Sequence, residues 1–306
     1  MSPASPSPAI PRPVLLDYGL IALLIIVWGS AYAMTAVALQ GFPPMVLVEF
    51  RLVVGAAVLG LVCAVLRARL PALGNWRAWG ALALVGVAGT LAPFGLISHA
   101  QARVPSALAA VYIAAAPIVV AILAHFAVPG EKLDPRRAFG VVLGFGGIVV
   151  LFAPALLGGG SGGAGLGDQL MLLLAACCYA TASILVRLVQ PDLHPIAMSF
   201  GFVLISAVLG IPFAMAEWPP GGMSPDAVQL ACAIGLALGS TALGNVLYVV
   251  VVRRVGPVFL ANAGNLMPFW SLLLGAGLLG EAVPPTLVAG LAVILAGIWM
   301  VRKKPA

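Results

Sequence analysis

Charge is scarce in this sequence. Only 8% of its 306 residues are charged, whereas 62% are hydrophobic. An ordinary soluble domain carries roughly 25% charged residues. A soluble fold of this length cannot bury so much apolar surface, so the composition excludes a soluble protein and predicts that lipid solvates much of the chain.

Side chains that bind metals or attack substrates are also rare. The chain has three scattered histidines, and its four cysteines lie in apolar runs without the spacing of metal ligands. An intramembrane enzyme would need a converging nucleophile and base, or metal ligands, at membrane depth. The sequence therefore predicts no metal, no cofactor and no enzymatic activity, and an intramembrane enzyme is kept only as a remote alternative.

The net charge of +6 does not indicate nucleic acid, because the basic residues form short clusters between apolar runs. The predicted partners are the lipid bilayer and a small-molecule solute, with no nucleic acid, for a monomer or a homodimer.

Apolar runs of the length that a membrane-spanning helix needs, about 20 residues, occur ten times. Their ends carry Pro- and Gly-rich turns, such as "QGFPP" at 40–44. The predicted spans are 17–39, 45–66, 76–99, 105–127, 135–156, 168–189, 195–217, 226–252, 257–279 and 284–302.

The distribution of Lys and Arg predicts the orientation of these spans. With a cytoplasmic N-terminus, thirteen of the fifteen basic residues fall on the cytoplasmic side, Arg103 falls on the outer side, and Arg51 lies within the second span. The positive-inside rule then places both termini in the cytoplasm and favours an even number of spans.

An internal repeat appears when the chain is shifted by 151 residues. Thr90 then meets Thr241, Arg103 meets Arg254 and Pro117 meets Pro268. Because five spans is an odd number, the second copy must start on the opposite face of the membrane. The predicted fold is therefore an all-α integral membrane protein with ten transmembrane helices, arranged as two inverted five-helix repeats, which is typical of secondary transporters.

The predicted domain boundaries follow from these spans. The repeats occupy 17–156 and 168–302, joined by a Gly-rich periplasmic or extracellular linker at 157–167. Residues 1–16 are expected to be a disordered cytoplasmic tail, and 303–306 form a short cytoplasmic tail.

Several short motifs mark the spans, and some of them recur in the second half. "WGS" at 28–30 and "EFR" at 49–51 lie in the first two spans, and the Pro-bearing fourth and ninth spans are each followed by "GE". With these motifs the chain resembles the drug/metabolite transporter superfamily, in particular its EamA-type ten-span exporters, over nearly all of 17–302. The resemblance implies a protein of the cytoplasmic (inner) membrane that moves small metabolites, often outward, and the group includes amino-acid exporters.

Polar and aromatic side chains recur at helical spacing within the spans, for example at Asn262 and Asn265. An unsatisfied amide in hydrocarbon costs several kcal/mol, so such faces should point at protein or at a wet cavity. Helix-to-helix hydrogen bonds that only hold the bundle together are the alternative. The predicted substrate-binding residues are Trp28, Ser30, Tyr32, Thr90, Phe94, Tyr112, Tyr179, Thr181, Ser183, Thr241, Asn245, Tyr248, Asn262 and Asn265.

Two prolines, Pro117 and Pro268, are predicted hinges of a gate, because a proline inside a span frees backbone carbonyls and permits bending. Ionisable groups within a span are functional by default, so Glu49 and Arg51 are candidates for coupling or for a gate. Both lie near the outer end of their span, from which Arg51 can extend to the membrane surface. Glycines in the fifth and tenth spans predict close helix packing, within the bundle or at a homodimer face.

The chemistry of this predicted lining constrains the solute. Its polar groups are neutral and its bulk is aromatic, and no Lys or Arg pair is expected near the membrane midplane to hold a phosphate. The sequence therefore predicts alternating-access export of small neutral or zwitterionic amphipathic metabolites, above all amino acids with aromatic or other hydrophobic side chains. An uncoupled facilitator and a multidrug exporter of organic cations are the alternatives.

Overall fold

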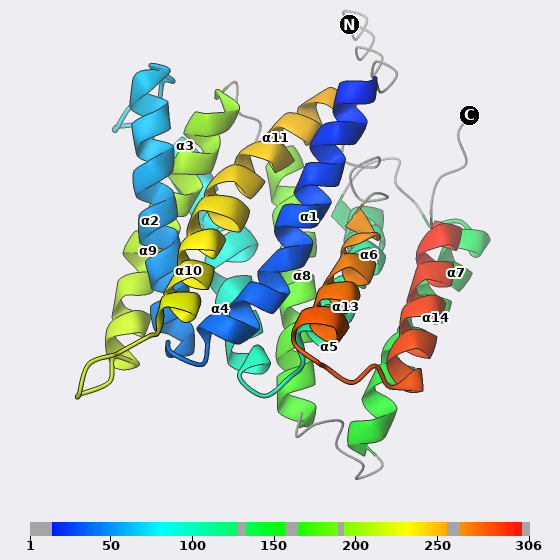
Figure 1. Ribbon diagram of the computed structural model, residues 1–306. Coiled ribbons are helices and arrows are strands. Elements are labelled where there is room, and N and C mark those ends of the chain that lie inside the picture. Colours follow the sequence, from blue (N-terminus) through cyan, green and yellow to red (C-terminus); the bar gives the residue numbers. More distant parts are fainter. Residues whose placement is uncertain (1–13, 128–132, 157–164, 189–192, 256–263, 302–306) are drawn as a thin grey trace, which may run out of the picture.

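The structure is a computed structural model of the 306-residue chain, and it describes residues 14–127, 133–156, 165–188, 193–255 and 264–301. Within these ranges every regular element is a helix and no strand is present (Figure 1). The elements are α1 (Leu15–Ala38), α2 (Pro44–Val65), α3 (Trp76–Gly86), η1 (Val87–Leu91), α4 (Ala92–Gln101), α5 (Ser106–Ile113), α6 (Ala116–Ala127), α7 (Pro135–Leu156), α8 (Leu166–Leu188), α9 (Pro195–Ala216), α10 (Ala227–Gly235), η2 (Leu236–Leu243), α11 (Gly244–Val255), α13 (Met267–Leu278) and α14 (Pro285–Val301).

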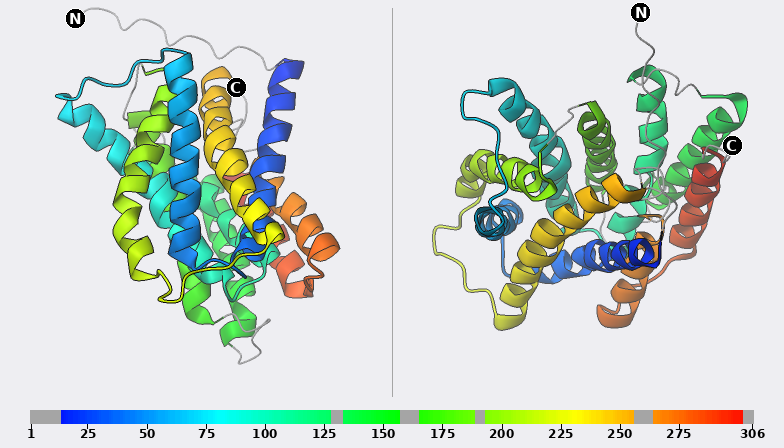
Figure 2. Two further views of the ribbon diagram at one scale, coloured as in Figure 1. Left: turned by 60° about the vertical axis from the view of Figure 1, so that its left-hand side comes forward. Right: turned by 90° about the horizontal axis from the view of Figure 1, so that it is seen from above.

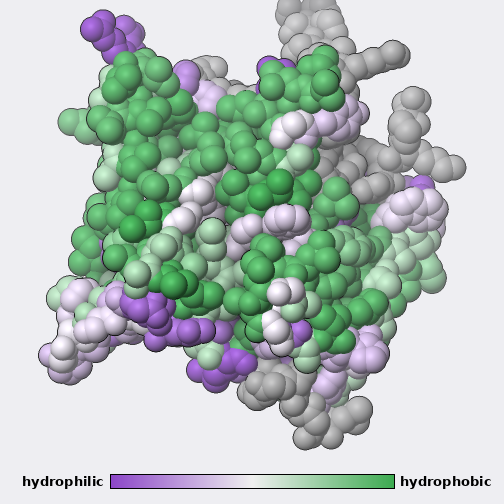
Figure 3. Space-filling model, viewed as in Figure 1, coloured by the Kyte–Doolittle hydropathy of each residue, from purple (hydrophilic) through white to green (hydrophobic). Residues whose placement is uncertain are grey.

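The bundle has an apolar exterior. In the described residues eight helical segments are long and apolar enough to cross a membrane, and α13 and α14 are shorter apolar helices. Large apolar side chains point outward, such as Leu61, which is 67% exposed, and Leu273, which is 64% exposed. Hydrophobic groups cover much of the face shown in Figure 3, with hydrophilic groups gathered toward its rims. The chain is therefore a multi-pass membrane protein.

The two ends of the bundle are named here after residues that lie at them. The Asp17 face is the end at which α1 begins and α11 ends, at the top of Figure 1, and it holds the paired residues Asp17 and Arg254. The Asp168 face is the end at which α8 begins, at the bottom of Figure 1, and it holds the paired residues Asp168 and Arg103.

The described helices lie where the sequence predicts spans, although residues 257–263 of the predicted ninth span fall outside the described residues. Four helices begin at the prolines Pro44, Pro135, Pro195 and Pro285. Proline suits the first helical position because the N–H it lacks would have no intrahelical partner there. Pro44 and Pro195 are related by the 151-residue shift, so each half begins its second span in the same way.

The predicted third and eighth spans are not uniform α-helices. Each contains a π-helical segment, η1 in the third and η2 in the eighth, and these segments hold Thr90 and Thr241. Short π segments inside α-helices occur frequently at functional sites.

The predicted fourth span, 105–127, is broken into two helices. α5 ends at Ile113 and α6 begins at Ala116, directly before Pro117. Proline has no N–H to donate to the preceding turn, and its ring would clash with the carbonyl four residues before it in a continuous α-helix. The break therefore falls in the turn before Pro117. Pro268 is likewise the second residue of α13, after a turn at 265–266.

Helices α7 and α14 pack side by side at one edge of the bundle, as Figures 1 and 2 show. A methyl group added to Gly297 would lie 2.6 Å from the carbonyl oxygen of Gly140, and one added to Gly147 would lie 2.8 Å from that of Gly290. The glycines of these two spans therefore permit backbone contact within the chain.

Candidate functional site

Arg51 of α2 turns into the bundle and is 5% exposed. Its Nε donates to Thr241 Oγ1 at 3.0 Å, and its Nη2 donates to Ser240 Oγ at 2.5 Å. Its guanidinium carbon lies 3.9 Å from the centre of the Phe94 ring. The expectation that Arg51 extends to the membrane surface is wrong in this structure, because two hydroxyls and a ring hold the side chain inward.

This inward position needs compensation. Insertion scales give a cost of about 2.5–3.5 kcal/mol for an arginine at the centre of a membrane helix. In the part of the chain that the structure describes, no carboxylate pairs with Arg51, and its polar contacts are the hydroxyls of Thr241 and Ser240. Among the described residues, therefore, neutral groups alone hold this cation in place.

Two tyrosines from different halves of the chain accompany Arg51. The hydroxyls of Tyr32 on α1 and Tyr179 on α8 lie within electrostatic range of the guanidinium and of each other. Both side chains are half-buried. Gln101 Nε2 donates to the backbone oxygen of Tyr32 at 3.0 Å, which fixes α1 against the end of α4.

The π-helical segment η2 supplies an acceptor to this cluster. The N–H of Gly244 bonds to the carbonyl of Gly239, five residues back, which releases the carbonyl of Ser240 from its α-helical partner. Trp28 Nε1 donates to that released oxygen at 3.1 Å, and the Trp28 ring lies 5.6 Å from the Tyr248 ring. The first and eighth spans are thus joined at the π segment, next to Arg51.

Asn245 follows η2 by one turn and is 8% exposed. Its Nδ2 donates to the carbonyl of Thr241 at 2.6 Å. The amide therefore supports the backbone at the position that holds Arg51.

Thr90, the repeat counterpart of Thr241, is fully engaged in helix packing. Its Oγ1 lies 2.6 Å from the Gly86 carbonyl and 2.7 Å from Ser206 Oγ on α9. Thr90 thus joins η1 to α9 as Thr241 joins η2 to α2. The two threonines occupy corresponding places, but Arg51 has a counterpart without charge.

Ser30 accepts a hydrogen bond of 2.9 Å from Trp270 Nε1, which connects α1 to α13 two residues beyond Pro268. Asn265 is half-buried in the turn before α13, and Asn262 lies outside the described residues.

Three predicted lining residues form their hydrogen bonds away from Arg51. Tyr112 is fully buried, donates to Gln169 Oε1 at 2.6 Å and packs edge-on against Phe152. Thr181 is exposed on α8, and the hydroxyls of Thr181 and Ser183 bond to carbonyls of their own helix. In this structure these side chains stabilise helices rather than surround Arg51.

Glu49 faces a different side of α2 from Arg51. Both carboxyl oxygens are buried without a hydrogen-bond partner among the described residues. The carboxyl group lies directly against Gly210 of α9, where an added methyl group would also touch Leu91. It is therefore enclosed between α9 and η1 and does not neutralise Arg51.

Two ion pairs lie at opposite ends of the bundle. On the Asp168 face Arg103 Nη2 lies 2.5 Å from Asp168 Oδ1, and on the Asp17 face Arg254 Nε lies 2.5 Å from Asp17 Oδ1. Asp168 and Asp17 are 151 residues apart, as are Arg254 and Arg103. The hydrogen bonds that Arg103 donates to the Asp168 carboxylate raise the pKa of Arg103, which keeps this pair charged.

Glu281, from the second "GE" motif, caps a helix of the other half. Its carboxylate accepts from the backbone N–H groups of Ser106 and Ala107 at 2.7 and 3.1 Å, and from Ser106 Oγ at 3.0 Å. A negative charge there also suits the positive end of the α5 dipole.

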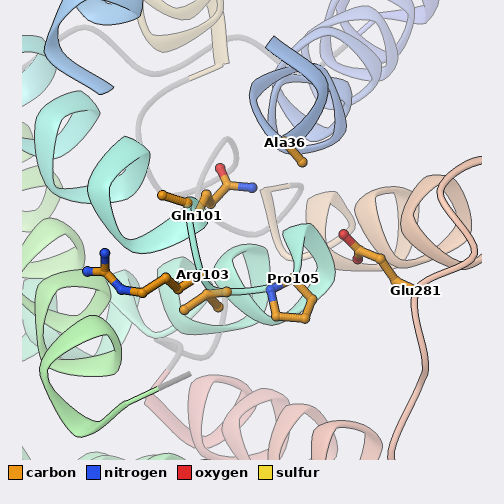
Figure 4. Close-up of a pocket in the computed structure, with 7 residues that line it drawn as sticks. Ala36, Gln101, Arg103, Pro105 and Glu281 are labelled. Atoms are coloured by element: carbon orange, nitrogen blue, oxygen red, sulfur yellow. The ribbon is translucent and has the colours of Figure 1, made fainter. Parts of the chain in front are cut away.

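An open cavity of about 490 Å³ lies on the Asp168 face (Figure 4). In Figure 4 Arg103 extends away from the hollow toward α8, while Glu281 points toward the start of α5. The lining residues are Ala36, Gln101, Ala102, Arg103, Val104, Pro105 and Glu281.

Sequence reasoning missed the two ion pairs and the hydroxyls of Ser206 and Ser240. The 151-residue shift contained a signal for the ion pairs, because it superposes Asp17 on Asp168 and Arg103 on Arg254. Among the described residues no group of three or more His, Cys, Asp or Glu side chains could hold a metal.

Comparisons with known proteins agree with this architecture. The model of the EamA-like transporter family matches the chain twice, over residues 16–153 and 167–303. A solved crystal structure aligns with a TM-score of 0.66 at 20% identity, covering 94% of this chain and 97% of that one, which shows a shared fold.

Two curated relatives cover almost the full chain. The Uncharacterized inner membrane transporter YedA of Escherichia coli strain K12 is 26% identical over 296 residues, 95% of this chain and 92% of YedA. The Probable terminal-alkyne amino-acid exporter of Streptantibioticus cattleyicolor is 26% identical over 290 residues, 93% of this chain and 92% of that protein.

Proposed function

Because the chain belongs to the EamA-like transporter family, we propose that it exports small neutral or zwitterionic amphipathic metabolites, namely amino acids with aromatic or other hydrophobic side chains. The transport site is the region around Arg51, Thr241, Tyr32, Tyr179 and Trp28.

The observation that carries this proposal is a reciprocal pattern of contacts between the two halves. Where a helix of the first half contacts a helix of the second, their counterparts in the other half contact each other. α1 contacts α13 as α8 contacts α6, and α2 contacts η2 as α9 contacts η1. The two Arg–Asp pairs are related in the same way, since each joins an arginine of one half to an aspartate of the other, and they lie at opposite ends of the bundle. Together with the twofold family match, this pattern supports two inverted repeats, 17–156 and 168–302, of five spans each.

Such symmetry supports alternating access. The Arg103–Asp168 pair closes the Asp168 face, and the Arg254–Asp17 pair closes the Asp17 face, so each half lends one side chain to each closure. Opening one pair while the other stays closed would expose the site between them to one side of the membrane. The breaks before Pro117 and Pro268 are then the hinges of this motion.

The chemistry of the site supports an amphipathic solute. Trp28, Tyr32, Tyr179, Tyr248 and Phe94 supply aromatic surface, and hydroxyls and backbone oxygens supply neutral polar groups. The relative from Streptantibioticus cattleyicolor, which is named a probable terminal-alkyne amino-acid exporter, supports the same class.

Orientation follows from the distribution of basic residues and from the inner-membrane relative. Both termini lie in the cytoplasm, which makes the Asp17 face cytoplasmic and the Asp168 face, with its cavity, external.

The test is uptake of radiolabelled phenylalanine by vesicles that contain the purified protein, with protein-free vesicles as control. Vesicles are loaded with unlabelled phenylalanine or left empty, with and without a pH gradient. We expect uptake that unlabelled aromatic amino acids inhibit. Uptake without a counter-solute or gradient would identify a facilitator, and transport of tetraphenylphosphonium alone would identify an exporter of organic cations. Absence of phenylalanine uptake under all of these conditions would overturn the proposal.

A further inference from the structure

The guanidinium of Arg51 has an unused edge. Arginine carries five N–H donors, and the described contacts of Arg51 use Nε and Nη2, which face the adjacent hydroxyls of Thr241 and Ser240. The remaining donors, on Nη1 and the end of Nη2, have no acceptor among the described residues. They form the end of the fork that binds a carboxylate through two parallel hydrogen bonds.

The guanidinium plane is fixed before any ligand arrives. Phe94 lies against one face of the group at 3.9 Å, while the two hydroxyls hold one edge. A side chain restrained on two sides loses little further freedom on binding, so its free edge is pre-organised for a planar partner.

Among the described residues no carboxylate takes this place. Glu49 is only two residues away, yet its carboxyl group lies against Gly210 on another side of α2. Asp17 and Asp168 are bound to Arg254 and Arg103 at the two faces.

Aromatic side chains lie in the neighbourhood of Arg51. Tyr32 and Tyr179 approach Arg51 from the first helix of each half. Trp28 lies one turn before Tyr32 on α1, and its ring packs against that of Tyr248 on α11. Carboxylate recognition beside an aromatic wall suits a molecule with one acidic end and one apolar end.

We propose that the free edge of Arg51 is a carboxylate-binding site and that Arg51 makes the transporter select solutes bearing a carboxylate next to an apolar or aromatic group. This inference rests on the proposed function and narrows it: an organic cation without a carboxylate is repelled, and the amino group of an amino acid is dispensable for docking at Arg51.

The experiment compares acid and amide in the vesicle assay. Competition against labelled phenylalanine is measured for phenylalanine, 3-phenylpropanoate and phenylalaninamide. We expect 3-phenylpropanoate to compete and phenylalaninamide to be at least tenfold weaker than phenylalanine. Equal competition by the amide and the acid would overturn the inference while leaving export of amino acids intact.

Variants assign the preference to this residue. The measured quantity is the ratio of the inhibitory concentration of phenylalaninamide to that of phenylalanine. Arg51→Gln should reduce this ratio to about one. Arg51→Lys keeps the charge but loses the two parallel N–H donors, and it should give an intermediate ratio. Arg136→Gln, which changes an arginine packed against Trp299 on the exterior, is the matched control and should keep the wild-type ratio. An unchanged ratio in Arg51→Gln would contradict the assignment, and if the Arg51 variants do not fold, the wild-type comparison decides alone.

A second readout separates this inference from the identity of the solute. If labelled phenylalanine is not transported, thermal unfolding of the purified protein is measured with 3-phenylpropanoate, benzoate and 4-methylpentanoate and with their amides. Stabilisation by the acids and not by the amides would uphold the carboxylate site although the proposed solute fails. Stabilisation by none of the acids would overturn it.

Discussion

Arg103 binds Asp168 through Nε and Nη2, which donate to the same carboxylate oxygen at 2.9 and 2.5 Å. The pair joins the loop after α4 to the start of α8, across the two halves of the chain. Arg254 and Asp17 make the corresponding contact at the other end of the bundle.

The first prediction concerns these closures. Asp168→Asn should open the Asp168 face, since the guanidinium of Arg103 loses its charged partner there. A cysteine in place of Ala36, which lines the cavity on that face, should then react several-fold faster with a water-soluble maleimide in a background without native cysteines. The matched variant Asp17→Asn should slow that reaction, and equal rates in the two variants would contradict a role of the pairs in access.

A charge exchange provides the second prediction. Arg103→Asp and Asp168→Arg should each reduce uptake, because each places two like charges together. The double variant restores an opposite pair and should recover much of the lost uptake, a non-additivity measured by a double-mutant cycle. Additive losses would mean that the contact has no energetic role in transport.

The third prediction uses two neighbouring glycines of α7. Gly147→Ala should destabilise the protein by about 1–3 kcal/mol, because the new methyl group would meet backbone atoms of α14 at 2.8 Å. Gly146→Ala has open space around the added methyl group and should be neutral or stabilising by up to about 1 kcal/mol. Thermal unfolding in detergent measures both, and a similar loss in the two variants would contradict tight α7–α14 packing.

A fourth prediction compares two threonines, both of which the sequence predicts to bind substrate. Thr241→Val removes an acceptor of Arg51 and should reduce phenylalanine uptake severalfold. Thr181→Val should leave uptake unchanged, because that side chain is exposed and bonds only to its own helix among the described residues. Loss of uptake in Thr181→Val would place that face of α8 in the transport pathway.

The fifth prediction concerns the cap on α5. Glu281→Ala leaves the N–H groups of Ser106 and Ala107 without their acceptor and should lower stability by about 0.5–2 kcal/mol. Glu281→Gln keeps one acceptor oxygen and should lose less. Unfolding temperatures of both variants, compared with the parent protein, test this order.

The sequence predicted the general plan of the fold because that plan depends on local properties. Apolar runs of spanning length become helices in lipid wherever they occur, and prolines such as Pro44 and Pro195 end turns and begin helices. The sequence did not predict the π segments or the gap between α5 and α6 in detail, because these depend on how neighbouring helices press on a backbone that tolerates several local geometries.

The candidate site could be predicted only in part. Trp28, Tyr32, Tyr179 and Thr241 were selected by helical spacing, and the structure gathers them around Arg51. Tyr112 and Thr181 had equally suitable spacing but face other surroundings, since spacing defines a helix face and does not say what that face contacts.

By itself, the sequence determined that the chain is a helical membrane protein, because hydrophobicity and span length are properties of single segments. It also determined that the two halves repeat, because the repeat appears when one segment is compared with another. Only the tertiary structure decided that Arg51 points inward to Thr241 and Ser240, that Glu49 does not neutralise it, and which arginine meets which aspartate. Those contacts join residues from different halves of the chain, and their geometry exists only after the helices have packed.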